Sequence, residues 1–423
     1  MSGAGTVVSL AAHSLWNRRV TALLTIFSIA VSVTLLLGVE RVRTEARASF
    51  ANTISGTDLI VGARSGDLNL LLYAVFRIGN ATNNITWQTY QDLASRREVA
   101  WTIPISLGDS HRGFRVMGTT AAYYEHYRFA RDRGLEFAVG RPVQDLFDAV
   151  IGADVARQLG YQVGQRVVIA HGLGAVSFMK HDDKPFVVSG ILKKTGTPVD
   201  RTIHVSLEAI EAMHMDWQSG TRQRGAETTP DEVRQADLTP KAITAVLVGL
   251  KSRAAAFRLQ RAINEYPQEP LSAVLPGVAL QQLWDLVGVV EIALLAVSGC
   301  VVLGGLLGML TAILTSLNER RREMAILRSV GARPWHIFAL LVSEAGLLAL
   351  AGVLLGFAAL YALLAALAPL IEDRFGIFVA IQLPGAYDLA IAGIVVGAAL
   401  LMGLLPAWRA YRSALADGLT IRL

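Results

Sequence analysis

Four long apolar stretches stand out along the chain, and each is long enough to cross a lipid bilayer as a helix. A bilayer core about 30 Å thick requires roughly 20 consecutive apolar residues in helical form. The first stretch is uncharged, the second contains the acidic residue Glu291, and the third contains Glu344. The pattern therefore predicts four membrane-spanning helices, at residues 20–39, 286–314, 337–371 (with an outer extension) and 387–407.

The segment between the first and second spans, residues 40–285, has the pattern of a folded domain. Short runs rich in Val and Ile, bounded by Gly, Pro or Asp, alternate with short stretches of helical periodicity. A large α+β extracytoplasmic domain, joined to the spans by a helical stalk, is therefore expected. The predicted strands are Leu59–Val61, Val99–Leu107, Phe114–Met117, Ala149–Ile151, Arg166–Ala170, Phe186–Leu192, Ile203–Val205 and Ile243–Leu250. The predicted helices are Leu68–Phe76, Trp87–Ser95, Ala153–Leu159, Leu207–Met213 and Arg253–Tyr266.

The remaining segments are short, and their arginines predict the orientation of the chain. Residues 1–19 are expected to form a helix in the membrane interface, 315–336 a loop containing a helix, 372–386 a short outer loop, and 408–423 a tail. Arginines concentrate before the first span, in 315–336 and in the tail. Because short basic flanks stay inside, both termini and 315–336 are expected in the cytoplasm. The first span is longer than the apolar core of a signal peptide, which favours an uncleaved anchor.

The composition agrees with this mixed architecture and excludes several kinds of chemistry. Of 423 residues, 53% are hydrophobic, the mean hydropathy is +0.44 and the net charge is +5. The single cysteine, Cys300, cannot form a disulfide within the chain. The sequence contains no GxxxxGK[ST], HExxH, CxxC or GxSxG motif, so no catalytic residue is assigned and ATP binding by a phosphate loop is excluded. Outer basic residues are interspersed with acids, which argues against nucleic-acid binding.

One polar segment carries the strongest signal. It reads LNERRREMAILRSVGARPWHIF over residues 317–338, and it predicts a helix that ends at Gly331, a residue type favoured at helix C-caps. Met324, Leu327 and Arg328 share one face at helical spacing, beside a dense charged cluster at 319–323. Such a helix can dock into a groove on a partner, or it can serve only as a positively charged topology signal. The candidate docking residues are Glu319, Arg320, Arg321, Arg322, Glu323, Met324, Leu327, Arg328 and Gly331.

The same segment resembles the signature of the MacB/FtsX-type ABC-transporter permeases, the group that includes lipoprotein-release permeases. There a Glu-Arg-x-x-Glu-(Ile/Met)-(Gly/Ala)-(Ile/Leu) run leads to Gly-Ala before the third span, as residues 319–332 do here. The first span, the segments 151–169 and 186–213, and LPAWRA at 405–410 are also similar to the family. The chain departs from it in lacking the frequent C-terminal Pro-x-x-Ala-Leu run and the ATPase domain that is fused to some members.

The resemblance implies a homodimer in the bacterial inner membrane, bound to two separate ATPase subunits. ATP and Mg would be bound by those subunits and no cofactor by this chain, with the 319–331 helix as the coupling element. Movement of the outer domains would export or extract a lipoprotein, lipid or peptide, and a periplasmic protein is a further candidate partner. Two alternatives remain open: an ATPase-coupled regulator of a periplasmic enzyme or of periplasmic metal handling, and a membrane receptor that needs no ATPase.

Small residues and acids within the spans are weaker candidates. The pairs Gly304/Gly308, Gly352/Gly356 and Gly393/Gly397 permit close helix packing, either within one protomer or in a dimer. Glu291 and Glu344 are ionisable groups inside apolar helices, which makes them functional candidates, and a helix partner or snorkelling explains them equally well. Histidines and methionines gather at His171, 179–183, His204 and 213–216 without a recognised ligand spacing, so no metal site is assigned.

Overall fold

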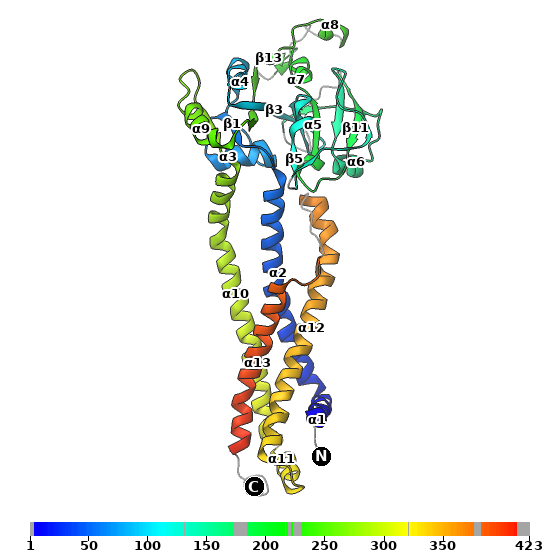
Figure 1. Ribbon diagram of the computed structural model, residues 1–423. Coiled ribbons are helices and arrows are strands. Elements are labelled where there is room, and N and C mark those ends of the chain that lie inside the picture. Colours follow the sequence, from blue (N-terminus) through cyan, green and yellow to red (C-terminus); the bar gives the residue numbers. More distant parts are fainter. Residues whose placement is uncertain are drawn as a thin grey trace. The chain divides into compact units, whose positions relative to one another are not determined.

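The computed structural model describes residues 4–130, 132–172, 184–215, 217–218, 221–222, 230–319, 321–375 and 382–412 (Figure 1). The chain divides into two compact units. We call the first the helical unit; it comprises Met1–Glu45, Gly288–Pro369 and Val379–Leu423. The second, the sheet unit, comprises Ala46–Val287 and Leu370–Phe378.

Among the described residues, four helices are long and apolar enough to cross a membrane, as the sequence predicts. They are α2 (Arg19–Thr53), α10 (Pro276–Glu319), α12 (Pro334–Phe375) and α13 (Ala386–Arg412). The short helices α1 (Ala4–Asn17) and α11 (Arg321–Ser329) lie in the segments 1–19 and 315–336. Helix α12 continues past Pro369 to Phe375, which is four residues beyond the predicted end at 371.

Close helix contacts in the helical unit occur where one partner is a small residue. Gly352 of α12 faces Ile29 of α2, and one turn later Gly356 faces Val33, so these two helices run in the same direction. A Cβ placed on Gly356 would lie 2.9 Å from the Cβ of Val33, which leaves no room for a side chain. The hydroxyl of Thr34 donates to the carbonyl oxygen of Gly356 at 3.0 Å and joins the same two backbones. Glycines therefore set the separation of α2 and α12.

In the described part of the chain, the sheet unit is built on an 11-stranded sheet. The strand order is β17 (Leu271–Val274), β1 (Leu59–Ala63), β16 (Ala245–Leu250), β3 (Val99–His111), β4 (Phe114–Thr119), β12 (Thr202–Ser206), β8 (Asp148–Ile151), β11 (Phe186–Leu192) and β7 (Phe137–Gly140). The short strands β10 (Ala170–His171) and β9 (Arg166–Val167) pair with β3 and β11. Smaller pairs are formed by β2 (Ile85–Thr86) with β15 (Ala242–Ile243), β5 (Arg128–Phe129) with β6 (Arg133–Gly134), and β13 (Trp217–Gln218) with β14 (Thr221–Arg222).

The long strand β3 connects two lobes of this sheet. Its first half pairs with β16 and its second half with β4, so one strand belongs to both lobes. Apolar residues of α4 (Trp87–Ala94) and α9 (Ala256–Asn264) cover the lobe of β17, β1 and β16. Those of α6 (Ala153–Leu159) and α7 (Leu207–His214) cover the lobe of β4, β12 and β8. A third core lies around α3 (Asp67–Leu71), the π-helical turn Leu72–Phe76 and α5 (Ala122–His126).

All eight predicted strands and all five predicted helices of this domain are present, although Arg166–Ala170 is found as two short strands. The α+β architecture is therefore confirmed. The strands β2, β5, β6, β7, β13, β14 and β17, the helices α5 and α8 (Pro230–Arg234), and the short 3-10 helix Pro198–Arg201 were not predicted. Each has five residues or fewer, which is too short to show a helical or alternating pattern.

Candidate functional site

Helix α11, in the segment with the strongest sequence signal, ends in a tight cap at Gly331. The N–H of Gly331 donates to the carbonyl oxygen of Arg328 at 3.1 Å, and the N–H of Ala332 donates to that of Leu327 at 3.0 Å. This pair of hydrogen bonds is a Schellman motif. It places Gly331 at φ +104°, a backbone conformation that favours glycine. The C-cap predicted at Gly331 is thus present, and it fixes where α11 ends.

The exposed face of α11 differs from the face predicted to dock. Met324 is half-buried and packs against the apolar core of the helical unit, next to Ala325, which is buried. Leu327 and Arg328 are also half-buried, whereas Glu323 is exposed. Ile326 and Val330, four residues apart, are 52% and 83% exposed. The stripe of Met324, Leu327 and Arg328 therefore lies partly inside this chain, and the apolar residues open to a partner are Ile326 and Val330.

The charged start of the same segment is described only in part. For Glu319, Arg321 and Arg322 the structure describes the backbone, which is helical. Arg320 lies outside the described residues. The segment thus forms the end of α10 and the beginning of α11, and a docking role for its charges stays a prediction.

The two acids within the spans both lie among other side chains. Glu344 of α12 is only 3% exposed and has an interaction partner. The neighbouring residue Ala345 packs against Gly403 of α13, so Glu344 lies near the contact between these helices. Oε2 of Glu291 on α10 lies 3.9 Å from Nη1 of Arg43 on α2. Glu291 is therefore accommodated by a cation from a neighbouring helix.

A second set of polar contacts connects α2, α12 and α13 in the helical unit. Nη1 of Arg41 lies 3.9 Å from Oδ2 of Asp388 on α13. Nη2 of Arg41 donates to the carbonyl oxygen of Gln382 at 2.7 Å, and the hydroxyl of Tyr361 on α12 donates to the same oxygen at 2.8 Å. Arg41 thus forms an ion pair from α2 to α13 and shares with Tyr361 of α12 one acceptor, which lies just before α13. These contacts restrain the relative positions of the three helices in this unit.

The glycine pairs separate into two kinds. Gly352 and Gly356 lie against α2, so they serve packing within the protomer. A Cβ placed on Gly304 or Gly308 of α10 would meet no atom within 4 Å. Only 6% of the apolar window of α10 is buried, against 28–39% for the other three spans. The face of α10 that carries Gly304 and Gly308 is therefore apolar and uncovered in the described protomer.

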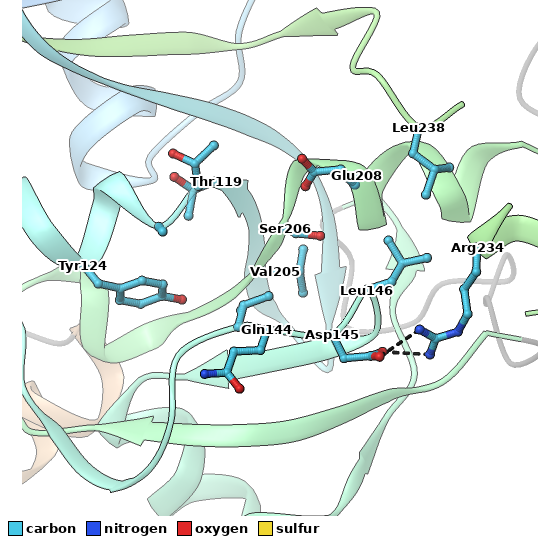
Figure 2. A pocket seen from close by; sticks show the side chains of 13 residues that line it. Thr119, Tyr124, Gln144, Asp145, Leu146, Val205, Ser206, Glu208, Arg234 and Leu238 are labelled. Atoms are coloured by element: carbon cyan, nitrogen blue, oxygen red, sulfur yellow. Dashed lines mark hydrogen bonds and ion pairs between the residues drawn. The ribbon is translucent and has the colours of Figure 1, made fainter. Parts of the chain in front are cut away.

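A polar cavity of about 510 Å³ lies in the sheet unit, where the parallel strands β4 and β12 end (Figure 2). Thr119 ends β4, and Ser206 ends β12 and caps α7 by accepting a hydrogen bond from the N–H of Ala209. The carboxyl ends of parallel strands are a common location of ligand sites. The other lining residues are Thr120, Ala121, Tyr124, Val143, Gln144, Asp145, Leu146, Val205, Glu208, Arg234 and Leu238.

An ion pair forms one side of this cavity, as Figure 2 shows. Both guanidinium Nη atoms of Arg234 donate to the carboxylate oxygens of Asp145 at 2.8 Å. These hydrogen bonds hold the pKa of Asp145 below its usual range. The guanidinium also lies over the ring of Phe147, at 5.5 Å from its centroid. The hydroxyl of Tyr124, a residue that lines the cavity, is buried and has no hydrogen-bond partner among the described residues.

The histidines of the sheet unit show no ligand set in the described ranges. His204 is fully buried, its Nδ1 lies 3.2 Å from the carbonyl oxygen of Val150, and burial lowers the pKa of His204 to about 3. Among the residues that the structure describes, no three His, Cys, Asp or Glu side chains are grouped as metal ligands would be. The predicted cluster at 179–183 and Asp216 lie outside the described residues.

Four candidate spans and a large α+β domain inserted between the first two define a class of membrane proteins with one large domain outside the spans. The model of the MacB-like periplasmic core domain matches residues 22–266, and that of the FtsX-like permease C-terminal domain matches residues 295–415. The chain belongs to this family of ABC-transporter permeases.

Two solved structures are similar to part of this chain. The periplasmic region of MacB from Actinobacillus actinomycetemcomitans has 10% identity and a TM-score of 0.34, over 55% of this chain and 94% of that chain. The extracellular domain of the noncanonic ABC-type transporter YknZ from Gram-positive bacteria has 13% identity and a TM-score of 0.31, over 51% of this chain and 98% of that chain. No curated protein matches the sequence.

Proposed function

We propose that this chain is the permease subunit of an ABC transporter and that a separate ATPase subunit drives it by binding α11. The observation that carries this proposal is the exposed apolar pair Ile326 and Val330 on a capped helix within the family's signature segment. Apolar residues at i and i+4 on one helix face are suited to a groove on a partner. ATP and Mg would bind to that partner, and this chain would not catalyse a reaction itself.

Movement of α11 would reach the spans through packing that the structure contains. Met324 packs on the apolar core of the helical unit, and a capped turn at Gly331 connects α11 to α12. Helices α2 and α10 continue without a break from the helical unit into the sheet unit. A displacement at α11 can thus be passed along continuous helical backbone. The spans are nearly all apolar and offer little polar lining for a hydrophilic cargo, which favours work done on the outer domain.

The outer cavity is the place where we expect part of the cargo to bind. Its volume of about 510 Å³ suits a small group such as a peptide end or a lipid-attached headgroup rather than a whole protein. The exposed carboxylate of Glu208 offers hydrogen-bond acceptors to such a group. A lipoprotein, lipid or peptide is the cargo class that we propose, handled at the outer face of a bacterial inner membrane.

A second copy of the chain would cover the open face of α10. Cys300, Gly304 and Gly308 recur every four residues along this helix, and Cys300 is exposed. Small residues at this spacing let two helices approach closely in lipid. Bismaleimide cross-linking at the single native cysteine tests the homodimer. A cross-linked dimer that Gly304→Leu abolishes supports it, and a monomer under all conditions in membranes contradicts it.

The ATPase partnership is tested by purifying the tagged chain from its native membrane in gentle detergent with added nucleotide. Mass spectrometry of the eluate should show a stoichiometric protein with a phosphate-loop motif. Such a protein would place α11 and both termini on the cytoplasmic side, which reporter fusions at residues 4 and 412 check independently. If no ATPase is present with or without nucleotide, the transporter assignment is wrong and the receptor alternative takes its place.

A further inference from the structure

A second cavity, of about 470 Å³, lies in the helical unit between the beginning of α2 and the last turns of α10. One wall comes from the junction of α1 and α2, and the other from α10. The residues that line it are Asn17, Arg18, Arg19, Val20, Thr21, Ala312, Thr315 and Ser316. None of these residues belongs to α11 or to the outer cavity, so the function proposed above does not use them.

Helices α2 and α10 are in contact at a level two to three turns away from the cavity. The hydroxyl of Ser32 on α2 donates to the carbonyl oxygen of Val301 on α10 at 3.2 Å. A Cβ on Gly305 would lie 3.0 Å from that hydroxyl oxygen, so the helices are in contact here. Two to three turns further along α10, the facing residues Ala312, Thr315 and Ser316 are short. On the other wall, α1 ends at Asn17, Arg18 forms a turn, and α2 begins at Arg19.

The side chains around the cavity suit a phosphate group. Arg19 contributes a guanidinium group, and Thr21, Thr315 and Ser316 contribute three hydroxyls; Arg18 also lines the cavity and has an interaction partner of its own. Guanidinium groups bind phosphate oxygens through two parallel N–H donors, and hydroxyls add single hydrogen bonds. The described residues that line the cavity include no carboxylate. The guanidinium of Arg19 therefore makes the lining favour an anion over a neutral or zwitterionic group.

The position of the cavity along the spans indicates where the phosphate comes from. The apolar span of α2 begins at Arg19 and that of α10 ends at Leu317. The cavity therefore opens at the boundary between the apolar spans and their polar ends, which is the level of lipid headgroups. Trp16, 74% exposed and one turn before Arg19, has the side chain that prefers this level. Val20 and Leu23 are exposed beside it and offer an apolar surface for acyl chains.

We propose that this cavity binds the phosphate headgroup of an anionic phospholipid. The bound lipid would fill the space between α2 and α10, with its phosphate on Arg19 and the hydroxyls of Thr315 and Ser316. Basic cavities between spans at this level are suited to anionic headgroups, and each basic residue near an anionic surface contributes about fivefold in affinity.

Native mass spectrometry of the full chain in detergent tests the proposal, with phosphatidylglycerol and phosphatidylcholine as probes at equal concentration. The wild type should bind a first phosphatidylglycerol at least about fivefold better than phosphatidylcholine. Arg19→Gln should remove about fivefold of that preference. Thr315→Val, which leaves the charge and the insertion signal unchanged, should lower the preference for phosphatidylglycerol about twofold. Arg412→Gln is the matched control, because it removes an exposed arginine from the end of α13 outside the cavity.

Three results would overturn the proposal. The first is equal binding of the two lipids by the wild type. The second is an equal loss in Arg412→Gln and Arg19→Gln, which would reveal attraction by surface charge without a site. The third is displacement of phosphatidylglycerol by glycerol phosphate at the same concentration, which would show that the cavity takes a soluble phosphate rather than a lipid.

Discussion

Arg43 on α2 is the common partner of two acids, with Nη2 donating to Oε1 of Glu40 at 2.7 Å and Nη1 lying 3.9 Å from Oε2 of Glu291 on α10. Glu40 is buried and also accepts a hydrogen bond from the hydroxyl of Thr44. An acid inside an apolar helix is costly unless it has a partner. One arginine thus makes two acids tolerable and connects α2 to α10.

Removal of Arg43 should therefore destabilise the helical unit more than removal of Glu291. Arg43→Ala is expected to lower the free energy of unfolding by about 2 kcal/mol, because Glu40 loses its ion pair and Glu291 loses one cationic contact. Glu291→Gln should cost less than about 1 kcal/mol, since Arg43 keeps Glu40. Unfolding in mixed micelles measures both values. The double variant should lower the free energy of unfolding by less than the sum of the two single variants. Strict additivity of the two losses would show that the side chains of Arg43 and Glu291 do not interact.

The contact between α2 and α12 predicts which glycine tolerates a side chain. Gly356→Val should destabilise the protomer by about 1–3 kcal/mol, because the new Cβ would meet Val33 at 2.9 Å. Gly397→Val is the matched control, since a Cβ there meets no atom within 4 Å. Thermal unfolding in detergent compares the two variants. Equal melting temperatures for both would mean that α2 and α12 are not packed as described.

Buried histidine should make the sheet unit sensitive to acid. His204 has a pKa of about 3 in the folded protein because burial disfavours its cation, and the pKa is near 6.5 in an unfolded chain. Below pH 6.5 the unfolded state binds a proton that the native state does not. This contribution to stability is therefore fully present above pH 6.5, and it falls by about 1.4 kcal/mol per pH unit as the pH decreases toward 3. Burial also lowers the pKa of His111, which adds to this slope.

Urea unfolding of the full chain at pH 7, 6 and 5, followed by tryptophan fluorescence, measures this slope. The window above pH 5 avoids the range in which most carboxylates titrate. His204→Gln should reduce the slope while His111 still contributes. An unchanged slope in this variant would show that His204 takes up a proton in the folded protein.

The sequence predicts the elements of this fold well because their patterns are long or strongly periodic. The four spans follow from apolar length, and strands such as Phe186–Leu192 follow from runs of Val and Ile between Gly and Pro. The side-chain contacts between different spans do not follow from such patterns. Glu291 and Arg43 are far apart in the sequence, and their contact depends on the register of α2 against α10, which local patterns do not encode.

The face of α11 shows a second limit of the sequence. Met324, Leu327, Ile326 and Val330 are all apolar, and periodicity alone does not tell which of them pack on their own chain and which are open to a partner. The structure separates them because the core of the helical unit covers Met324 and leaves Val330 exposed. The polar cavity at Thr119, Tyr124 and Ser206 was also missed, since its residues come from strand ends that are distant in sequence.

The most direct test of the account compares Val330→Asp with the wild type for retention of the ATPase during purification from native membranes. Val330 is 83% exposed, so the change should leave the fold intact and alter only the docking face. Val163→Asp, at an exposed valine of the sheet unit, is the matched control. The account predicts that Val330→Asp loses at least about nine-tenths of the bound ATPase while Val163→Asp retains it. Equal retention by all three proteins would contradict α11 as the coupling helix.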